Sequence, residues 1–294
     1  MKTDLLIIGA GRSGTTSIYE YLKNHTQICF SKIKEIHYFS IDELFNRTEK
    51  YYHSLYDCQQ KENQIFASAD TYLFIAQTEI IKRIYDYNSK MKFIIMLRNP
   101  IDRAFSGYQY AINNGYLNKK ISFIESIKNE EKLLNKDISI IQQNNLCNIY
   151  QSKYFYHLKR WTSIFPKNNF LLLKTDELKK SQQTVLNKIA DFCNIDKFQA
   201  SGKIKANTAK KVKSKKFEQI LLNRDLKIRK VLSRIVPNKL KQKIFDSKIV
   251  DKLHSINKTD GKIAEINEQE KKYAQKIFLD ELKNLKSDFN IDLL

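Results

Sequence analysis

The feature that most constrains this chain is a glycine-rich turn near its N-terminus. A short apolar run, Leu5–Ile8, leads into the sequence GAGRSGTT (residues 9–16), and a helical pattern follows. Three of the seven glycines of the chain lie in the first six positions of this turn. Glycine permits positive φ and close approach of the backbone to a ligand. A strand that turns here into a helix N-terminus presents amide groups and a positive dipole end, so the stretch predicts an anion site, most often for phosphate.

The spacing of Gly9, Gly14 and Thr16 is that of the Walker A loop, yet Thr15 stands where that motif has its lysine. The basic residue lies earlier, as Arg12. The turn is therefore typical of a phosphate cradle, but not of an ordinary nucleotide-hydrolysing one. A P-loop kinase acting on a small molecule stays as the first alternative, and turnover of ATP with magnesium would support it.

Short apolar runs alternate with amphipathic segments along most of the chain. Buried strands are expected at residues 5–8, 27–30, 65–69, 93–97 and 170–173. Helices are expected at residues 15–24, 41–56, 77–87, 104–113, 154–165, 181–193, 217–235 and 266–285, with less regular helices and loops around an acceptor site in 114–150. This alternation indicates the α/β class, with a parallel sheet covered by helices on both faces. We expect one domain over residues 1–294, with a nucleotide-binding core at about 4–200 and a basic helical part at 203–294.

The net charge of +20 is unevenly distributed. Residues 203–250 contain sixteen lysines and arginines against three acidic residues. Such a patch attracts polyanions, so a module that binds nucleic acid or an anionic membrane is the second alternative. Solvated, lysine-rich helices explain the same composition equally well. Within this region, residues 217–236 are apolar on one face and lysine-rich on the other, a pattern shared by helices that rest on a membrane and, more commonly, by helices packed on their own domain.

The four cysteines, Cys29, Cys58, Cys147 and Cys193, are far apart and form no C-x-x-C pair. This pattern favours buried thiols in a reduced compartment over a disulfide framework or a zinc site. The start of the chain does not resemble a signal peptide, and no apolar run approaches the roughly 18 residues that span a bilayer. We therefore expect a cytoplasmic protein with at most a peripheral contact to the inner face of a membrane.

Three segments together resemble the sulfotransferases that use 3′-phosphoadenosine 5′-phosphosulfate (PAPS). The loop at 9–16 is similar to the family's 5′-phosphosulfate loop, G-x-x-[KR]-x-G-T-T. RNPIDRAFS (98–106) is similar to its 3′-phosphate segment, R-[ND]-P-x-x-R-x-x-S, and residues 161–192 to its third strand and the helix after it. The resemblance covers about residues 4–220. It implies a three-layer fold with P-loop-like topology and an enzyme that transfers a sulfuryl group to an acceptor hydroxyl.

The resemblance also implies which residues contact the cosubstrate. Backbone amides and hydroxyl groups of the loop would hold the 5′-phosphate: Ser13, Gly14, Thr15 and Thr16. Arg12 would neutralise charge on the bridging oxygen, while Arg98 and Ser106 match the residues that hold the 3′-phosphate. Candidates from the segment that folds over the nucleotide are Lys210, Lys211 and Lys213. No metal is implied, because fixed cations supply the positive charge, and no nucleic acid is expected as a partner.

KEIHYF (34–39) is similar to the K-E-x-H-[FY]-F segment of glycan-modifying members, in which the glutamate is the general base. The similarity implies Glu35 as the base for the acceptor hydroxyl and His37 as a group that orients or polarises it. Two positions depart from the pattern: Ser40 where those members often have an acidic residue, and Ser68 where relatives often have a cation. The expected acceptor is a hydroxyl on a carbohydrate or glycoconjugate, such as a glycan or glycolipid.

Overall fold

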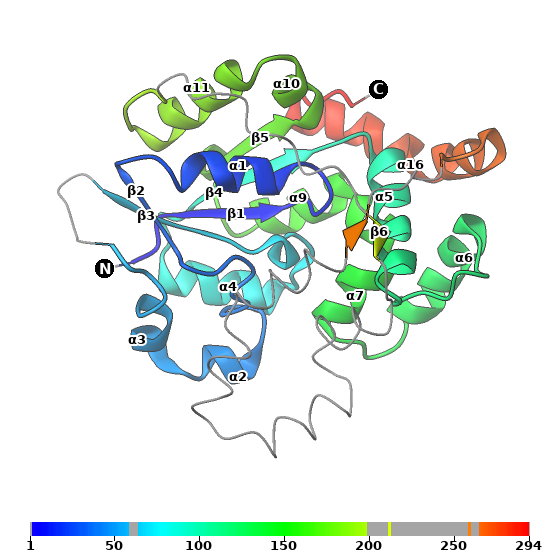
Figure 1. Cartoon of the computed structure of the whole chain (residues 1–294), viewed down its shortest axis with the longest axis horizontal. Helices are drawn as coiled ribbons and strands as arrows, with labels where there is room; N and C mark the ends of the chain where they lie inside the picture. The colour runs from blue at the N-terminus through cyan, green and yellow to red at the C-terminus, as the bar shows by residue number, and fades with distance from the viewer. Residues whose placement is uncertain (1, 59–63, 199–210, 213–257, 260–264, 294) are drawn as a thin grey trace.

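A computed structural model describes residues 2–58, 64–198, 211–212, 258–259 and 265–293 of the chain. Its centre is a five-stranded sheet of order β2-β3-β1-β4-β5, in which every neighbouring pair is parallel (Figure 1). The strands are β1 (Leu5–Gly9), β2 (Ile28–Phe30), β3 (Ile65–Ala69), β4 (Lys92–Leu97) and β5 (Phe170–Lys174). Each strand expected from the sequence is confirmed to within one residue at either end.

The side chains of β1 alternate between the two helical layers. Leu5 and Ile7 pack with the first helix, α1 (Thr15–Leu22), and with α11 (Gln182–Cys193). Leu6 and Ile8 pack on the opposite side with α4 (Thr78–Tyr87) and α9 (Tyr154–Thr162). Figure 1 shows α1 and α11 on one side of the sheet and α4 on the other. The expected three-layer α/β architecture is thereby confirmed, and β1 is buried on both faces, as parallel sheets require.

The remaining described elements connect these layers or extend them. They are α2 (Asp42–Phe45), α3 (Thr48–His53), α5 (Pro100–Asn113), α6 (Phe123–Leu134), α7 (Ile140–Leu146), α8 (Asn148–Ser152), α10 (Thr175–Lys180), α16 (Glu268–Phe289) and the 3₁₀ turns η1 (Thr71–Ile75) and η2 (Lys167–Asn169). The single helix expected at 41–56 is wrong. The chain breaks there into α2 and α3, because Thr48 takes a left-handed φ of 57°. The helix expected at 217–235 lies outside the described residues.

A third apolar cluster lies beside the sheet, where α5, α6, α8 and α16 meet. Phe123 of α6 and Phe278 of α16 are completely buried in it. Gly107 of α5 faces α8, and a Cβ at this position would lie 1.9 Å from Oδ1 of Asn148. The Asn148 side chain therefore occupies the space beside Gly107, and a side chain at position 107 would displace it.

Beyond residue 198, the structure describes residues 211–212, 258–259 and 265–293. Strand β6 (Lys211–Val212) pairs antiparallel with β7 (Lys258–Thr259), and α16 then packs against α5, α6 and α9. The single-domain boundaries and the separate basic part stay predictions. Across the described ranges, no helix combines the length and the apolar character needed to cross a bilayer.

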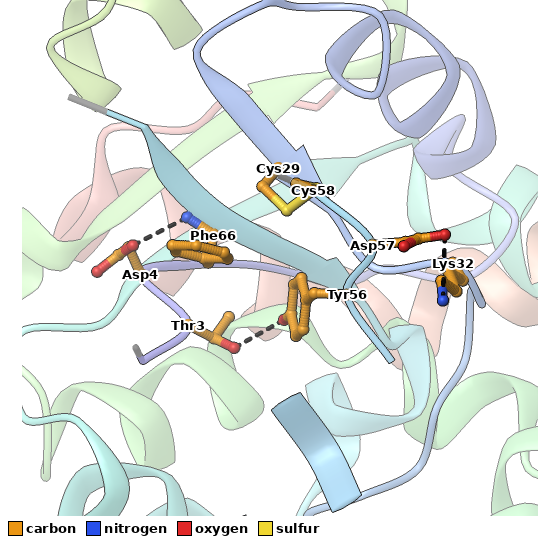
Figure 2. The surroundings of a disulfide bond; sticks show 8 residues. All are labelled: Thr3, Asp4, Cys29, Lys32, Tyr56, Asp57, Cys58 and Phe66. Atoms are coloured by element: carbon orange, nitrogen blue, oxygen red, sulfur yellow. Dashed lines mark hydrogen bonds and ion pairs between the residues drawn. A yellow bond between two sulfur atoms is a disulfide. The ribbon is translucent and has the colours of Figure 1, made fainter. Parts of the chain in front are cut away.

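Cys29 and Cys58 form a disulfide, with their Cα atoms 5.9 Å apart (Figure 2). The expectation of thiols at these two positions is wrong, whereas Cys147 and Cys193 are buried free thiols. The pairing arises because the chain after α3 returns antiparallel to the end of β2. A backbone bond from the Lys32 amide to the Leu55 carbonyl, 2.9 Å long, marks this return. The two cysteines are 29 residues apart in the sequence, which conceals their proximity.

We predict that the denatured but unreduced protein exposes two of its four cysteine thiols to a thiol reagent, and all four after reduction. Cys58 is the exposed partner, so Cys58→Ser removes the cross-link without burying a hydroxyl group. Because the cross-link restricts the unfolded chain, this variant should lose about 2–4 kcal/mol in the free energy of unfolding, measured by denaturant titration. Four reactive thiols without reductant would contradict the disulfide.

Candidate active site

The polar residues singled out by the sequence gather at the carboxyl edge of the sheet. The glycine-rich loop follows β1, residues 31–40 follow β2, Asp70 follows β3 and Arg98 follows β4. Strand β1 lies between β3 and β4, and the strand order reverses at this point. Ligands of open α/β sheets bind in the crevice at such a reversal. The topology therefore brings four segments, distant in the sequence, to one site.

The loop between β1 and α1 is tightly bent. Gly14, with φ of 95°, is the N-cap of α1, and no side chain caps this helix end. The first amides of a helix have no intrahelical acceptor, so those of Thr15 and Thr16 are available to an anion. Ser13 is fully buried, and its amide donates to the Ala10 carbonyl over 3.2 Å. A phosphate contact from the Ser13 amide would have to replace that bond.

Arg12 extends from the loop toward α5. Its Nε donates to Oγ of Ser106 over 3.3 Å, and its guanidinium lies 4.9 Å from the ring centre of Tyr110. Arg12 is exposed, yet the surrounding protein displaces enough solvent to lower its pKa. Tyr110 opposes this shift, and the charge of Arg98 adds to it. The structure thus brings Arg12, Ser106 and Arg98 together.

Arg98 connects β4 to α5. Its Nη2 lies 3.7 Å from Oδ2 of Asp102, and its Nε is buried without a hydrogen-bond partner among the described residues. The next residue, Asn99, caps α5 by accepting the amides of Ile101 and Asp102, and Pro100 occupies the first helical position. Proline suits that position because its missing amide has no partner there. The R-N-P sequence therefore starts α5 and leaves Arg98 with one nitrogen that has no protein partner among the described residues.

The Glu35 carboxylate is held by Thr71, at the start of η1. The Thr71 amide donates to Oε2 over 2.7 Å, and its hydroxyl donates to Oε1 over 3.0 Å. A quarter of the Glu35 side chain is still exposed. Burial raises its pKa, Lys34 opposes that shift, and the charge of Asp70 raises the pKa further. A carboxylate with a raised pKa is a stronger base than an ordinary one.

Lys34 is a site residue that the sequence analysis did not single out. Its Nζ donates to Oγ1 of Thr16 over 3.0 Å and lies 3.6 Å from Oε1 of Glu35. One ammonium group thus bridges the N-terminus of α1 and the candidate base. Its position next to Glu35 in the sequence was the available signal, but the direction of its side chain depends on the sheet.

His37 is buried and fixed by Asp70, a second residue that the sequence analysis missed. The His37 amide donates to Oδ2 of Asp70 over 3.0 Å, and Nδ1 lies 3.3 Å from Oδ1. Tyr72 packs on the imidazole, with ring centres 4.5 Å apart. Although burial opposes it, the charge of His37 lowers the pKa of Asp70, so this carboxylate stays ionised. Both Glu35 and His37 take a left-handed φ of 59°, and their side chains contact Thr71 and Asp70, the residues that follow β3.

The remaining expected residues receive less structural information. Lys210 and Lys213 lie outside the described residues, and Lys211 is described only as the start of β6. Ser68 is buried beside Ser31, whose hydroxyl donates to it over 3.2 Å, so the cation missing from this position is replaced by a neutral pair. Among the residues that the structure describes, no group of three or more His, Cys, Asp or Glu side chains is arranged to hold a metal ion.

Comparison with known proteins agrees with this geometry. The chain is 26% identical to human heparan sulfate glucosamine 3-O-sulfotransferase 5 over 197 residues, which cover 65% of this chain and 53% of that protein. It is 25% identical to human carbohydrate sulfotransferase 15 over 244 residues, which cover 64% of this chain and 43% of that protein. The matched part thus spans about half the length of these relatives.

The fold is also similar to a crystal structure of a sulfotransferase from Alicyclobacillus acidocaldarius. The TM-score is 0.67 at 20% identity, and the match covers 100% of this chain and 98% of the other. This likeness confirms the expected P-loop-like fold. The sulfotransferase domain family matches residues 2–276. This chain therefore belongs to the sulfotransferase domain family.

Proposed function

We propose that this protein is a PAPS-dependent sulfotransferase that modifies a hydroxyl group of a carbohydrate or glycoconjugate, with Glu35 as the general base. Membership of the family supports sulfuryl transfer, and the heparan sulfate and carbohydrate sulfotransferases among its relatives support the acceptor class. The observation that carries the proposal is the bridge made by Lys34. The Lys34 ammonium group contacts both the Glu35 carboxylate and Thr16, so the candidate base lies close to the N-terminus of α1.

The residues of the site fit a nucleotide that carries anions at both its 5′ and 3′ positions. The amides of Thr15 and Thr16 suit the 5′-phosphate, since a helix N-terminus favours an anion. The partly exposed guanidinium of Arg98, together with Ser106, suits a 3′-phosphate. Arginine matches phosphate geometry through its planar fork of donors. When bound, PAPS supplies a sulfuryl group attached to the 5′-phosphate through a bridging oxygen.

Each side chain of the site then has a separate role in the reaction. Glu35 removes the proton of the acceptor hydroxyl as the new oxygen–sulfur bond forms. The bond between sulfur and the bridging oxygen breaks, and negative charge moves to the departing phosphate. Lys34 and the first amides of α1 stabilise that charge, which is the main contribution expected of an enzyme in such an in-line displacement. Asp70 and His37 fix the loop that carries Glu35.

Arg12 lies between the glycine-rich loop and α5. Its contacts with Ser106 and Tyr110 place the guanidinium on the side of the candidate 3′-phosphate site. We therefore assign Lys34 the position next to the bridging oxygen, with Arg12 between the two phosphate sites. This assignment is an alternative to the expectation that Arg12 neutralises the charge on the bridging oxygen.

Two further expectations stay proposals. A cytoplasmic location rested partly on the absence of disulfides, and disulfides are rare in the cytosol, so the Cys29–Cys58 bond weighs against it. Peripheral contact with an anionic membrane was based on residues 217–236, which lie outside the described residues. Sulfotransferase membership favours sulfuryl transfer over both a small-molecule kinase and a non-enzymatic basic module.

We predict that adenosine 3′,5′-bisphosphate binds with an affinity measurable by calorimetry, and that Arg98→Met weakens this binding about 10–100-fold, because a charged hydrogen bond is lost. The same substitution should barely change the affinity for adenosine 5′-monophosphate, which has no 3′-phosphate. Arg83→Met is the matched control, since Arg83 also faces one aspartate and its side chain is also 29% exposed. Absence of binding at millimolar ligand, or equal losses for both nucleotides, would count against the proposal.

Replacement of the base provides an independent test. Glu35→Gln should lower kcat about 10²–10⁴-fold, because the proton acceptor is removed, while the affinity for adenosine 3′,5′-bisphosphate stays unchanged. In the wild type, Glu35 must be ionised to act, and its pKa lies above the usual 4.5. Activity should therefore rise with pH through a value above 4.5, and the residual activity of Glu35→Gln should lack that rise.

Glu20→Gln serves as the control for this measurement, because Glu20 is a carboxylate of α1 that pairs, within the described part of the chain, with Lys23 in the next helical turn. It should retain the wild-type pH profile. The role of Glu35 as a base is wrong if Glu35→Gln keeps the wild-type kcat or the same acidic limb.

A further inference from the structure

Arg103 of α5 is a completely buried arginine that lies beneath the glycine-rich loop. Its Nε donates to the Gly11 carbonyl over 2.9 Å. Its other nitrogens reach α8, where they donate to the Asn148 carbonyl over 2.8 Å, to the hydroxyl of Ser152 over 3.3 Å and to Oε1 of Gln151. All of these acceptors are neutral oxygens. One side chain therefore joins the loop to α8.

The charge that balances Arg103 lies at the other side of α8. Glu130 of α6 is also buried, and its carboxylate accepts the amides of Ile149 and Tyr150, in the first turn of α8. A carboxylate is favourable at a helix N-terminus. Burial raises the pKa of Glu130 to about 7 and lowers that of Arg103 to about 10, and the charge of each opposes the shift of the other. The two residues form a charge pair that acts through the backbone of α8.

Helix α8 has little freedom to move away from α5. Gly107, one turn after Arg103, leaves room for the side chain of Asn148, whose Oδ1 lies in the space that a Cβ would fill. Asn148, Gln151 and Ser152 are all buried. A displacement of α8 would consequently shift the acceptors of Arg103, and with them the Gly11 carbonyl.

We propose that Arg103 and Glu130 are positioning residues for the phosphate-binding loop, and that they act through α8. Arg103 fixes the peptide that precedes Arg12, and Glu130 holds α8 in the position that Arg103 requires. Both side chains are buried and engaged by protein groups, so their role does not require contact with a nucleotide. The effect on catalysis rests on the proposed function, because it requires that the loop bind the donor; the effect on the loop does not. Misplacing a reacting group by about 1 Å can lower the rate about 10²-fold. We therefore expect the buried hydrogen bonds that hold the loop to matter for activity.

The test compares two conservative variants with a matched control. Arg103→Lys keeps the charge but loses the planar fork of donors, and Glu130→Gln keeps the shape but loses the charge. The control is Asp4→Asn. Asp4 is also a partly buried carboxylate that accepts a backbone amide, from Phe66 over 2.9 Å, and burial also raises its pKa (Figure 2). It lies at the opposite end of β1 from the loop.

Hydrogen–deuterium exchange of the ligand-free proteins measures the loop directly. We expect faster exchange in residues 9–16 and 148–152 in Arg103→Lys and Glu130→Gln, at a temperature where circular dichroism shows both folded. We also expect about tenfold weaker binding of adenosine 3′,5′-bisphosphate, and a raised KM for the donor together with a lowered kcat. Asp4→Asn should lower Tm while its loop exchange and nucleotide affinity match the wild type.

The proposal is overturned if both folded variants show wild-type exchange in residues 9–16. It is also overturned if Asp4→Asn accelerates exchange there equally, because the effect would then follow global stability. Failure of the wild type to bind the nucleotide would instead contradict the proposed function, while the exchange measurement would still decide whether Arg103 and Glu130 fix the loop.

Discussion

The hydrogen bond from Lys34 to Thr16 is the interaction on which the organisation of the site depends. It joins the chain after β2 to the N-terminus of α1 and keeps the Glu35 carboxylate beside the same ammonium group. The bond is possible only because parallel strands end at one edge of the sheet, with β1 in the centre of the order. The parallel sheet thus determines which charged groups lie close together in the site. Their spacing along the sequence has little influence on that proximity.

Among the described residues, the arginines of the site have few close acidic partners. Burial lowers the pKa of Arg12, and the nearby charge of Arg98 lowers it further. Near them, Asp102 gives Arg98 only a distant partner at 3.7 Å, and the Glu35 carboxylate is shared between Lys34 and Thr71. Like charges held together raise the free energy of the folded protein. A ligand with two separated phosphate groups would relieve this repulsion, which explains why a folded chain retains the arrangement.

The sequence predicts the parts of this fold that depend on neighbouring residues. The strand-loop-helix unit around Gly14 and the cap formed by Asn99 are local, so the order of residues along the chain is enough to identify them. The missed features join distant residues: Asp70 and His37 are 33 positions apart, and Arg103 and Gly11 are 92 apart. The Cys29–Cys58 disulfide was missed for the same reason, because its spacing has no motif.

The choice of arginine at position 12 follows from the way in which the two candidate phosphate-binding segments are joined. A planar guanidinium can donate to Ser106 and stack on Tyr110 at once, whereas an ammonium group offers only a point charge. Arg12 thereby connects the loop to α5 at the surface, and Arg103 connects α5 back to the loop beneath it. These reciprocal contacts join two segments that the sequence separates. A change in the position of α5 should therefore alter both candidate anion sites together.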